Sequence, residues 1–218
     1  DKERYQTIYS KFEGSVAAPT AGLHFTKKVE EELLEQGCQF AELTLHVGAG
    51  TFKPVKAEEI GDHEMHSEHF TVSLPFLKQV LSAKKAGQLI VCVGTTSLRA
   101  LESLFWFNSE GDINQWDPYS KDNEEAEVDV LSRLISYLEI NSEDSLKAKT
   151  GIMIAPGYRF KFVDGIITNF HQPGSTLLLL VSALIGNDWK KVYDYALKNE
   201  FRFLSYGDSS LLWKKQLN

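Results

Sequence analysis

Several features that define common protein classes are scarce or missing in this sequence of 218 residues. Its 2 cysteines, Cys38 and Cys92, sit among apolar neighbours, which argues against a disulfide framework and favours a reducing compartment. No apolar run approaches the about 18 residues that a membrane-spanning helix needs. The charged start Asp1-Lys-Glu-Arg4 lacks the apolar segment of a signal peptide. We therefore expect a cytoplasmic protein with no membrane segment.

Motifs of common nucleotide and acyl chemistry are also missing. The sequence has no G-x-G-x-x-G, no P-loop and no G-x-S-x-G nucleophile elbow. These absences disfavour an ordinary dinucleotide or nucleoside triphosphate as ligand, and lower the odds of a serine hydrolase. The net charge of −7 mildly disfavours a chain built to bind nucleic acid. The sequence does contain three local basic pairs, which we interpret as solvated surface charges: Lys27 with Lys28, Lys53 with Lys56, and Arg159 with Lys161.

What the sequence does contain is an alternation of strand and helix patterns. This order predicts an α/β fold, with one Rossmann-like mixed or parallel sheet flanked by helices over residues 1–218. Segment 88–93 is apolar from Leu89 to Val93, which is typical of a strand buried on both faces. Further strands are predicted at 42–47, 70–73, within 159–170, and at 201–206. Helices are predicted at 25–36, 74–86, 96–107, 177–185 and 188–199, with Thr26, Ser73 and Ser175 or Thr176 as caps.

A polar, partly acidic stretch at about residues 109–149 interrupts the alternation and is interpreted as an insertion. Its second half repeats apolar residues at helical spacing, namely Val128, Leu131, Leu134, Ile135 and Leu138. We expect one amphipathic helix whose apolar stripe packs on the main domain. A helix that binds a partner is the alternative.

Three turns of similar composition, at residues 18–24, 94–99 and 171–176, place small residues and hydroxyls at helix starts. The free N–H groups and the dipole of a helix N-terminus suit a carboxylate or a phosphate. Capping alone explains the hydroxyls of any one turn, but three such turns favour a binding site. Arg99 suits an anion as well, unless it pairs with Glu102 on the surface. The binding candidates are Thr20, Gly22, Thr95, Thr96, Ser97, Arg99, Arg159, Asn169, Gly174, Ser175 and Thr176.

Histidines supply the candidates for proton transfer. In the cluster at residues 63–69, an extended chain places His66 and Glu68 on one face, which suits acid–base chemistry. The ligand spacing there is poor for a metal ion, so we expect none, and a solvated loop is the alternative. His46 lies in a predicted strand just before Gly48 and Gly50, whose missing side chains allow a ligand to approach the backbone; a histidine with its hydrogen bonds satisfied before a tight turn is the alternative. His24 and His171 lie in the first and third turns.

Taken together, these segments resemble the S-adenosylmethionine:tRNA ribosyltransferase-isomerases of queuosine biosynthesis. The similarity follows family order across nearly the whole chain. It is carried by 1–9, by Gly14-Ser-Val-Ala-Ala-Pro-Thr-Ala-Gly-Leu-His-Phe-Thr26, by Leu43-Thr-Leu-His-Val-Gly-Ala-Gly-Thr-Phe-Lys-Pro-Val55, by His66-Ser-Glu68, by Val93-Gly-Thr-Thr-Ser-Leu-Arg-Ala-Leu-Glu-Ser103, by Pro156-Gly-Tyr-Arg-Phe160, by 163–183, and by Phe201-Arg-Phe-Leu-Ser-Tyr-Gly-Asp208.

The resemblance implies an enzyme that transfers and isomerises the ribosyl moiety of S-adenosylmethionine, a co-substrate, onto 7-aminomethyl-7-deazaguanine in a tRNA anticodon. Epoxyqueuosine forms, adenine and methionine leave, and no cofactor is needed. Members also carry an N-terminal portion with an inserted β-barrel, so this chain resembles the C-terminal part. Two alternatives stay open: a hydrolase that binds S-adenosylmethionine or another nucleoside, and a non-catalytic RNA-binding fragment.

Overall fold

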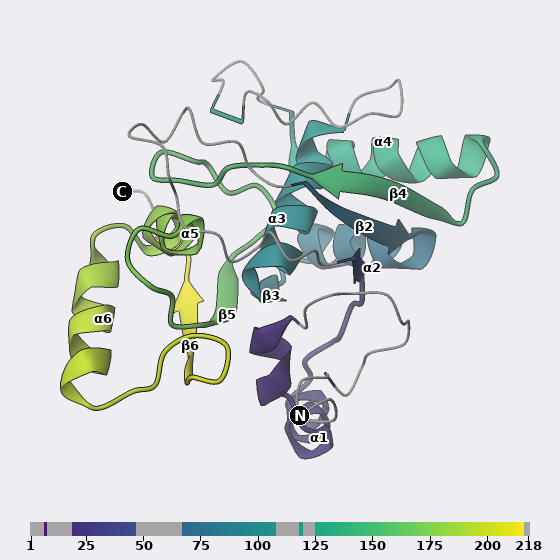
Figure 1. Cartoon of the computed structure of the whole chain (residues 1–218). Coiled ribbons are helices and arrows are strands. Elements are labelled where there is room, and N and C mark those ends of the chain that lie inside the picture. Colours follow the sequence, from purple (N-terminus) through teal and green to yellow (C-terminus); the bar gives the residue numbers. More distant parts are fainter. Residues whose placement is uncertain (1–6, 8–18, 47–66, 108–117, 120–124, 216–218) are drawn as a thin grey trace.

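The computed structural model describes residue 7 and residues 19–46, 67–107, 118–119 and 125–215. Within these residues the fold is α/β, as predicted, with two three-stranded sheets flanked by helices (Figure 1). The second sheet was not foreseen, because the sequence pattern suggested a single one. None of the helices in the described ranges combines the length and the apolarity that crossing a membrane requires.

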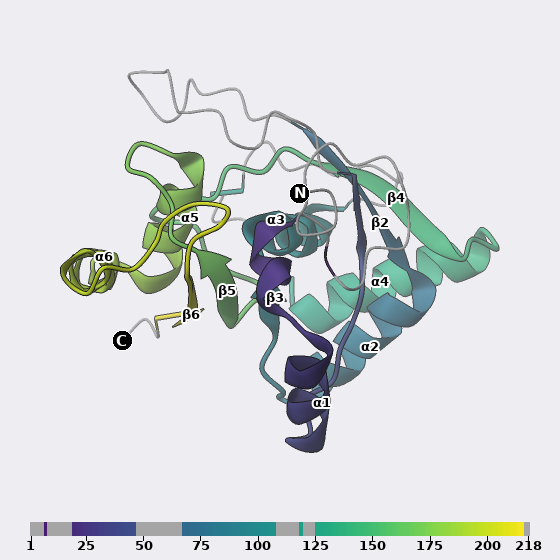
Figure 2. The same cartoon turned by 60° about the horizontal axis from the view of Figure 1, so that its bottom comes forward.

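The first sheet, sheet A, is antiparallel throughout and has the strand order β1-β2-β4. Its strands are β1 (Thr44–His46), β2 (Glu68–Ser73) and β4 (Ser145–Thr150). Helices α2 (Leu74–Lys85) and α4 (Glu127–Ile140) pack against each other on one side of this sheet, as both views show (Figure 2).

Helix α4 is the amphipathic helix that the apolar spacing predicted. Its Leu131, Leu134, Ile135 and Leu138 are buried in the main core, so the expected packing is confirmed. The same stretch also supplies β4, which pairs with β2 along the whole of that strand. The stretch is therefore part of the framework of sheet A as well as a cover for it.

Sheet B is mixed, with the order β3-β5-β6. Its strands are β3 (Val91–Val93), β5 (Gly165–Asn169) and β6 (Ser209–Trp213). The first two run parallel, and β6 joins antiparallel to β5. This half of the fold also contains helix α3 (Thr95–Ser103), the 3₁₀ turn η4 (Leu104–Trp106), α5 (Thr176–Ile185) and α6 (Asp188–Lys198). The 3₁₀ helix η1 (Thr20–His24) precedes α1 (Lys27–Glu35) in the chain.

The predicted strand at 201–206 is wrong, because these residues form a turn and the strand begins at Ser209. The Asp208 carboxylate accepts from the backbone N–H of Arg202 at 2.7 Å and from its guanidinium at 3.0 Å, which closes the turn. A Cβ on Gly207 would lie 2.4 Å from the carbonyl oxygen of Arg202, so only glycine fits. The apolar side chains there pack on Phe170 instead of following a strand.

The caps predicted at three helix starts are confirmed. Thr26, Ser73 and Ser175 each accept a hydrogen bond from a backbone N–H of α1, α2 and α5, respectively. Of the two free thiols, Cys92 is buried, and burial raises its pKa. Cys38, which we expected in apolar surroundings, is exposed.

Replacing Leu134 by alanine tests whether α4 belongs to the common core. Because Leu134 is fully buried, the change should lower the free energy of unfolding by about 2–5 kcal/mol. The control is Ile140→Ala at the end of the same helix, where the side chain is 81% exposed and the change should cost less than about 0.5 kcal/mol. Equal losses by chemical denaturation would contradict the packing described here.

Candidate functional site

Asn169, at the carboxyl end of β5, is the centre of a polar cluster. Its side-chain oxygen accepts from the Thr20 hydroxyl at 3.1 Å. Its side-chain nitrogen lies 3.1 Å from His24 Nε2 and 3.3 Å from the carbonyl oxygen of Gly207, to which it donates. Asn169 thereby joins η1, β5 and the C-terminal turn, which are far apart in the sequence. Ligands of open α/β sheets bind at this carboxyl edge.

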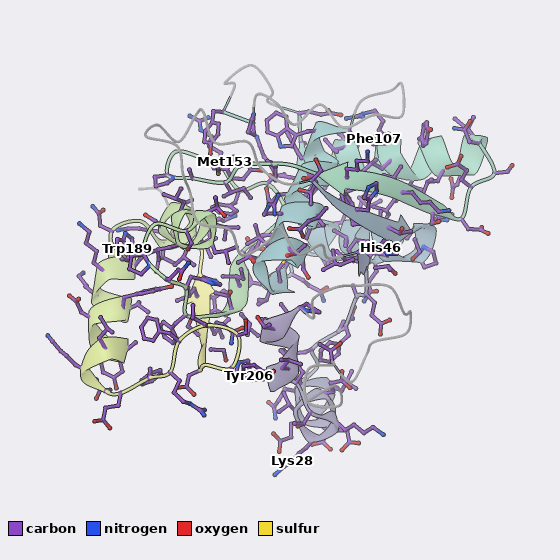
Figure 3. All side chains as sticks on the ribbon, viewed as in Figure 1. Lys28, His46, Phe107, Met153, Trp189 and Tyr206 are labelled. Atoms are coloured by element: carbon purple, nitrogen blue, oxygen red, sulfur yellow. The ribbon has the colours of Figure 1, made fainter. Side chains whose placement is uncertain are left out.

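His24 is the exposed member of this cluster. An amide nitrogen can only donate, so the contact with Asn169 makes Nε2 the acceptor and leaves the proton of the neutral ring on Nδ1. The pKa of the Asp208 carboxyl, in the C-terminal turn, is lowered by Arg202 first and by His24 to a smaller extent. The cluster therefore holds an accessible imidazole in a defined orientation (Figure 3 marks the adjacent Tyr206).

The N-terminus of α3 lies beside η1. Gly94 precedes the helix with a φ of +90°, a backbone conformation that favours glycine. A Cβ at Gly94 would lie 3.8 Å from that of Ala21 in η1. Thr95 and Thr96 form the first turn and are both buried. The first and second of the three predicted turns therefore meet at this edge of sheet B.

This helix start is electrostatically uncompensated. Among the six α-helices of the described residues, α3 alone has neither a side-chain cap nor an acidic residue in its first turn. Its N–H groups and the positive end of its dipole are therefore available to an anionic group. A carboxylate or phosphate bound there would satisfy them.

Arg99 and Glu68 form a buried ion pair, and Arg99 does not pair with Glu102 as the alternative interpretation allowed. Arg99 Nη1 lies 3.1 Å from Glu68 Oε1, and both side chains are about 5% exposed. Arg99 Nε also donates to the carbonyl oxygen of Ile152 at 3.2 Å. Burial lowers the pKa of Arg99, and Glu68 opposes that shift. Among the described residues, Arg99 Nη2 has no hydrogen-bond partner, so this cation keeps a donor for a ligand.

Glu102, one turn further along α3, is a structural residue that the sequence analysis treated only as a partner for Arg99. Its carboxylate is completely buried and accepts from the Tyr158 hydroxyl and from the N–H groups of Lys161, Phe162 and Val163, at 2.8–3.0 Å. Burial raises the pKa of Glu102, and the four hydrogen bonds oppose that shift. Glu102 thus fixes the connection that leads into β5.

His171 lies in a different environment from His24. Its side chain is 8% exposed, and its Nε2 is 2.9 Å from the Thr168 hydroxyl. Its backbone N–H donates to the Tyr193 hydroxyl on α6. Burial lowers the pKa of His171 to about 4, so the ring is neutral at neutral pH. A neutral imidazole has one ring nitrogen that can accept a proton and one N–H that can donate a hydrogen bond.

The remaining candidates are more widely spread. Ser175 caps α5 and donates to the carbonyl oxygen of Gln172, so its hydroxyl is engaged in capping. Thr176 is buried in the first turn of α5, and Gly174 has a φ of +71° in the turn before it. Gly22 is buried in η1, Ser97 is half-buried in α3, Arg159 is exposed, and His46 is exposed at the end of β1. His66, Gly48 and Gly50 lie outside the described residues.

Three residues of the site region were missed from the sequence. Asp208 and Gly207 belong to the segment 201–208 that carried the resemblance, but its reading as a strand hid the turn. Tyr193 gave no signal, because a tyrosine on an amphipathic helix is most often a packing residue. In all three cases the missing information was a long-range contact.

The fold and the site define an α/β domain with a polar cluster, formed around Asn169 and His24, beside a helix N-terminus that has no cap. Comparison with known proteins identifies the family of this domain. The family model described as "Queuosine biosynthesis protein" matches residues 1–212, and the chain belongs to this family.

Similar proteins are named S-adenosylmethionine:tRNA ribosyltransferase-isomerase. The protein from Halothermothrix orenii is 44% identical over 97% of this chain and 53% of its own length, and the one from Legionella pneumophila (strain Lens) is 47% identical over the same shares. The crystal structure of the S-adenosylmethionine tRNA ribosyltransferase from Thermotoga maritima superimposes with a TM-score of 0.60 at 31% identity, over 88% of this chain and 50% of that protein. The chain thus spans about half the length of these relatives.

Removing the Glu68 carboxylate should strongly destabilise the fold. In Glu68→Ala the guanidinium of Arg99 stays buried without its counter-charge, which costs about 3–5 kcal/mol of the free energy of unfolding. The matched control is Glu139→Ala, which breaks the exposed Lys78–Glu139 pair and should cost less than about 1 kcal/mol. If urea denaturation gives the same small loss for both, the buried pair is not a structural element.

His171 should make stability depend on pH on the acid side. Its folded pKa of about 4 lies below the ordinary 6.5, so the unfolded chain binds the proton more readily. Above pH 6.5 the ring is neutral in both the folded and the unfolded chain and does not lower the free energy of unfolding. As the pH drops from 6.5 towards 4, the unfolded chain takes up the proton first, so the free energy of unfolding falls. The penalty reaches at most about 3 kcal/mol. Denaturation of wild type and His171→Gln across this range should show the difference; parallel curves would contradict it.

Proposed function

We propose that this chain supplies the ligand-binding α/β part of an S-adenosylmethionine:tRNA ribosyltransferase-isomerase. The reaction transfers and isomerises the ribosyl moiety of S-adenosylmethionine onto 7-aminomethyl-7-deazaguanine in a tRNA anticodon, and releases adenine and methionine. The names of the relatives and the shared family support the assignment. The two substrates are S-adenosylmethionine and that tRNA, no metal or other cofactor takes part, and the reaction takes place in the cytoplasm.

One observation carries the proposal: an exposed, oriented histidine lies next to a site for an anion. His24 is held by Asn169, and η1, which contains His24, lies against the start of α3. A sulfonium nucleoside with a methionine tail needs both features. Its carboxylate needs positive partners, and the departing adenine and the carbon beside the sulfonium need proton transfer.

In this proposal the methionine carboxylate binds at the N-terminus of α3. The N–H groups around Thr95 and Thr96 and the donor that Arg99 keeps free all favour a negative charge. Glu68 then acts on Arg99, by holding the guanidinium in place, and does not itself move protons.

His24 is the proton-transfer group of this arrangement, and Asn169 is its positioning residue. By donating to Nε2, Asn169 selects the tautomer of the neutral ring with the proton on Nδ1 and fixes the orientation of that N–H. His171, neutral and enclosed, is the second candidate on the other side of β5. Thr20 fixes the Asn169 side chain from the opposite end.

The test measures adenine released from S-adenosylmethionine. The chain is assayed alone and in a longer polypeptide that also carries the half of its relatives that it does not match, with and without tRNA bearing 7-aminomethyl-7-deazaguanine. Release only with this tRNA supports the proposal. Release without tRNA favours a hydrolase that binds S-adenosylmethionine or another nucleoside, and tRNA binding with no release from either polypeptide favours a non-catalytic RNA-binding fragment.

Single-residue variants test which side chains take part in catalysis. Because general acid–base groups contribute about 100-fold or more, His24→Ala should lower turnover by at least that factor, and Asn169→Ala by less. Asn199→Ala, a matched change at the exposed end of α6, should leave turnover unchanged. Wild-type turnover in His24→Ala, with the fold intact by circular dichroism, would rule out His24 as the proton-transfer group.

A further inference from the structure

The Tyr119 hydroxyl, in the polar stretch at about residues 109–149, bridges two backbone groups of a distant segment. It donates to the carbonyl oxygen of Met153 and accepts from the backbone N–H of Ala155, both at 2.9 Å. Burial raises the pKa of Tyr119, so at neutral pH the hydroxyl keeps the proton that it donates. One side chain of the stretch thus satisfies two polar groups of the main chain, 34 and 36 positions away.

The two backbone groups belong to segment 151–155, which follows β4 and, within the described part of the chain, forms neither a helix nor a strand. Its Ile152 and Ile154 side chains are buried in the main core, and Met153 between them (labelled in Figure 3) is half-buried. A segment outside a sheet has no ladder of hydrogen bonds, so its backbone groups need other partners. Tyr119 supplies such a partner.

The carbonyl oxygen of Ile152, in the same segment, is one of two anchors of the Arg99 guanidinium. It accepts from Arg99 Nε at 3.2 Å, and Glu68 Oε1 accepts from Nη1 at 3.1 Å. A guanidinium is a rigid planar fork, so two anchors on different nitrogens fix its plane, whereas one anchor leaves it free to pivot. The direction of Nη2, which has no hydrogen-bond partner among the described residues, therefore depends on both anchors.

The two anchors differ in how they are held. Glu68 lies in β2, the central strand of sheet A, which pairs with β1 on one side and β4 on the other. Ile152 lies outside the strands, one residue before the carbonyl group that Tyr119 binds. The carbonyl groups of Ile152 and Met153 belong to adjacent peptide planes that share the Met153 Cα, so a shift of one displaces the other. The anchor at Ile152 therefore depends on the Tyr119 hydroxyl.

We propose that Tyr119 is a positioning residue for Arg99, which it orients through the peptide units of segment 151–155. The inference rests on the proposed function, in which Arg99 binds the methionine carboxylate, and adds a residue of the polar stretch to that site. Tyr119 also contacts the ring of Tyr158 edge-on, with centroids 6.1 Å apart. A phenylalanine at position 119 keeps this ring contact and loses only the hydroxyl bridge.

The first measurement follows the Arg99 side chain without any ligand. In the chain labelled with ¹⁵N, the Nε–H signal of Arg99 is assigned by its loss in Arg99→Lys, and its exchange with water is timed by NMR. Tyr119→Phe should speed this exchange about tenfold, because the hydrogen bond to Ile152 opens more often. The control is Tyr195→Phe on α6, whose side chain is exposed and which should leave the rate unchanged. Equal rates in wild type and Tyr119→Phe would overturn the proposal.

The second measurement uses the longer polypeptide of the adenine assay and varies the concentration of S-adenosylmethionine. Tyr119→Phe should raise KM about tenfold with kcat nearly unchanged, because the carboxylate is bound equally before and during the reaction. In an Arg99→Lys background, which lacks the guanidinium fork, Tyr119→Phe should raise KM no further. Leu134→Ala weakens the core without touching segment 151–155 and should leave KM unchanged. A KM effect of the same size in both backgrounds would show that Tyr119 does not act through Arg99.

The outcomes separate this inference from the proposed reaction. If the wild-type polypeptide releases no adenine while Tyr119→Phe still speeds the exchange at Arg99, the reaction is wrong and the positioning of Arg99 stands. If adenine is released only with tRNA and Tyr119→Phe has the KM of wild type, the reaction stands and the role of Tyr119 is wrong.

Discussion

The buried carboxylate of Glu102 is the constraint on which the rest of the structure depends. Removing a carboxylate from water costs several kcal/mol, and this one has no cation beside it among the described residues. Its four donors compensate because three of them are successive backbone N–H groups, which can point at one oxygen pair only if the chain wraps around it. The requirement to satisfy Glu102 therefore determines the path of residues 158–163, and so the point at which β5 begins.

Helix α3 connects the two sheets through buried polar contacts of the same kind. Arg99 ties it to β2, and the Ser103 hydroxyl lies 2.8 Å from that of Thr150 at the end of β4. Glu102 ties it to the entry of β5. Because polar contacts hold its buried side so firmly, the helix start can remain without a cap. A stable framework around a helix N-terminus with unmet hydrogen-bonding capacity is what pre-organised anion recognition requires.

Local features were predictable from the sequence, and features built from distant residues were not. Caps such as Thr26 and Ser73, and the apolar stripe of α4, follow from interactions within a few residues. Strand β4 was missed because Lys147 and Lys149 give a polar alternation that is also typical of a solvated loop. The pairing of Arg99 with Glu68, rather than with Glu102 three positions away on the same helix, depends on how sheet A meets α3.

The site candidates divide in the same way. Strand ends and helix starts identified Thr20, His24, Asn169 and the first turn of α3 as residues near a ligand edge, and the structure does gather them. From the sequence, His171 was expected in an environment similar to that of His24. The structure shows that His171 is buried among apolar side chains, whereas His24 is exposed. Burial of this kind arises from the packing of α6 and the turn at 201–208, which no local pattern encodes.

The hydrogen bonds of Asn169 also set the order in which the domain can mature. They join η1 to β5 and then to the turn at Gly207, three segments that are far apart in the sequence. Contacts of such large sequence separation form late and slowly, because the intervening chain must first be ordered. During synthesis, sheet A and the core around α4 can assemble while the C-terminal turn is still inside the ribosome. The polar cluster around His24 can close only after the turn at 201–208 has emerged, so partly made chains contain the framework without the site.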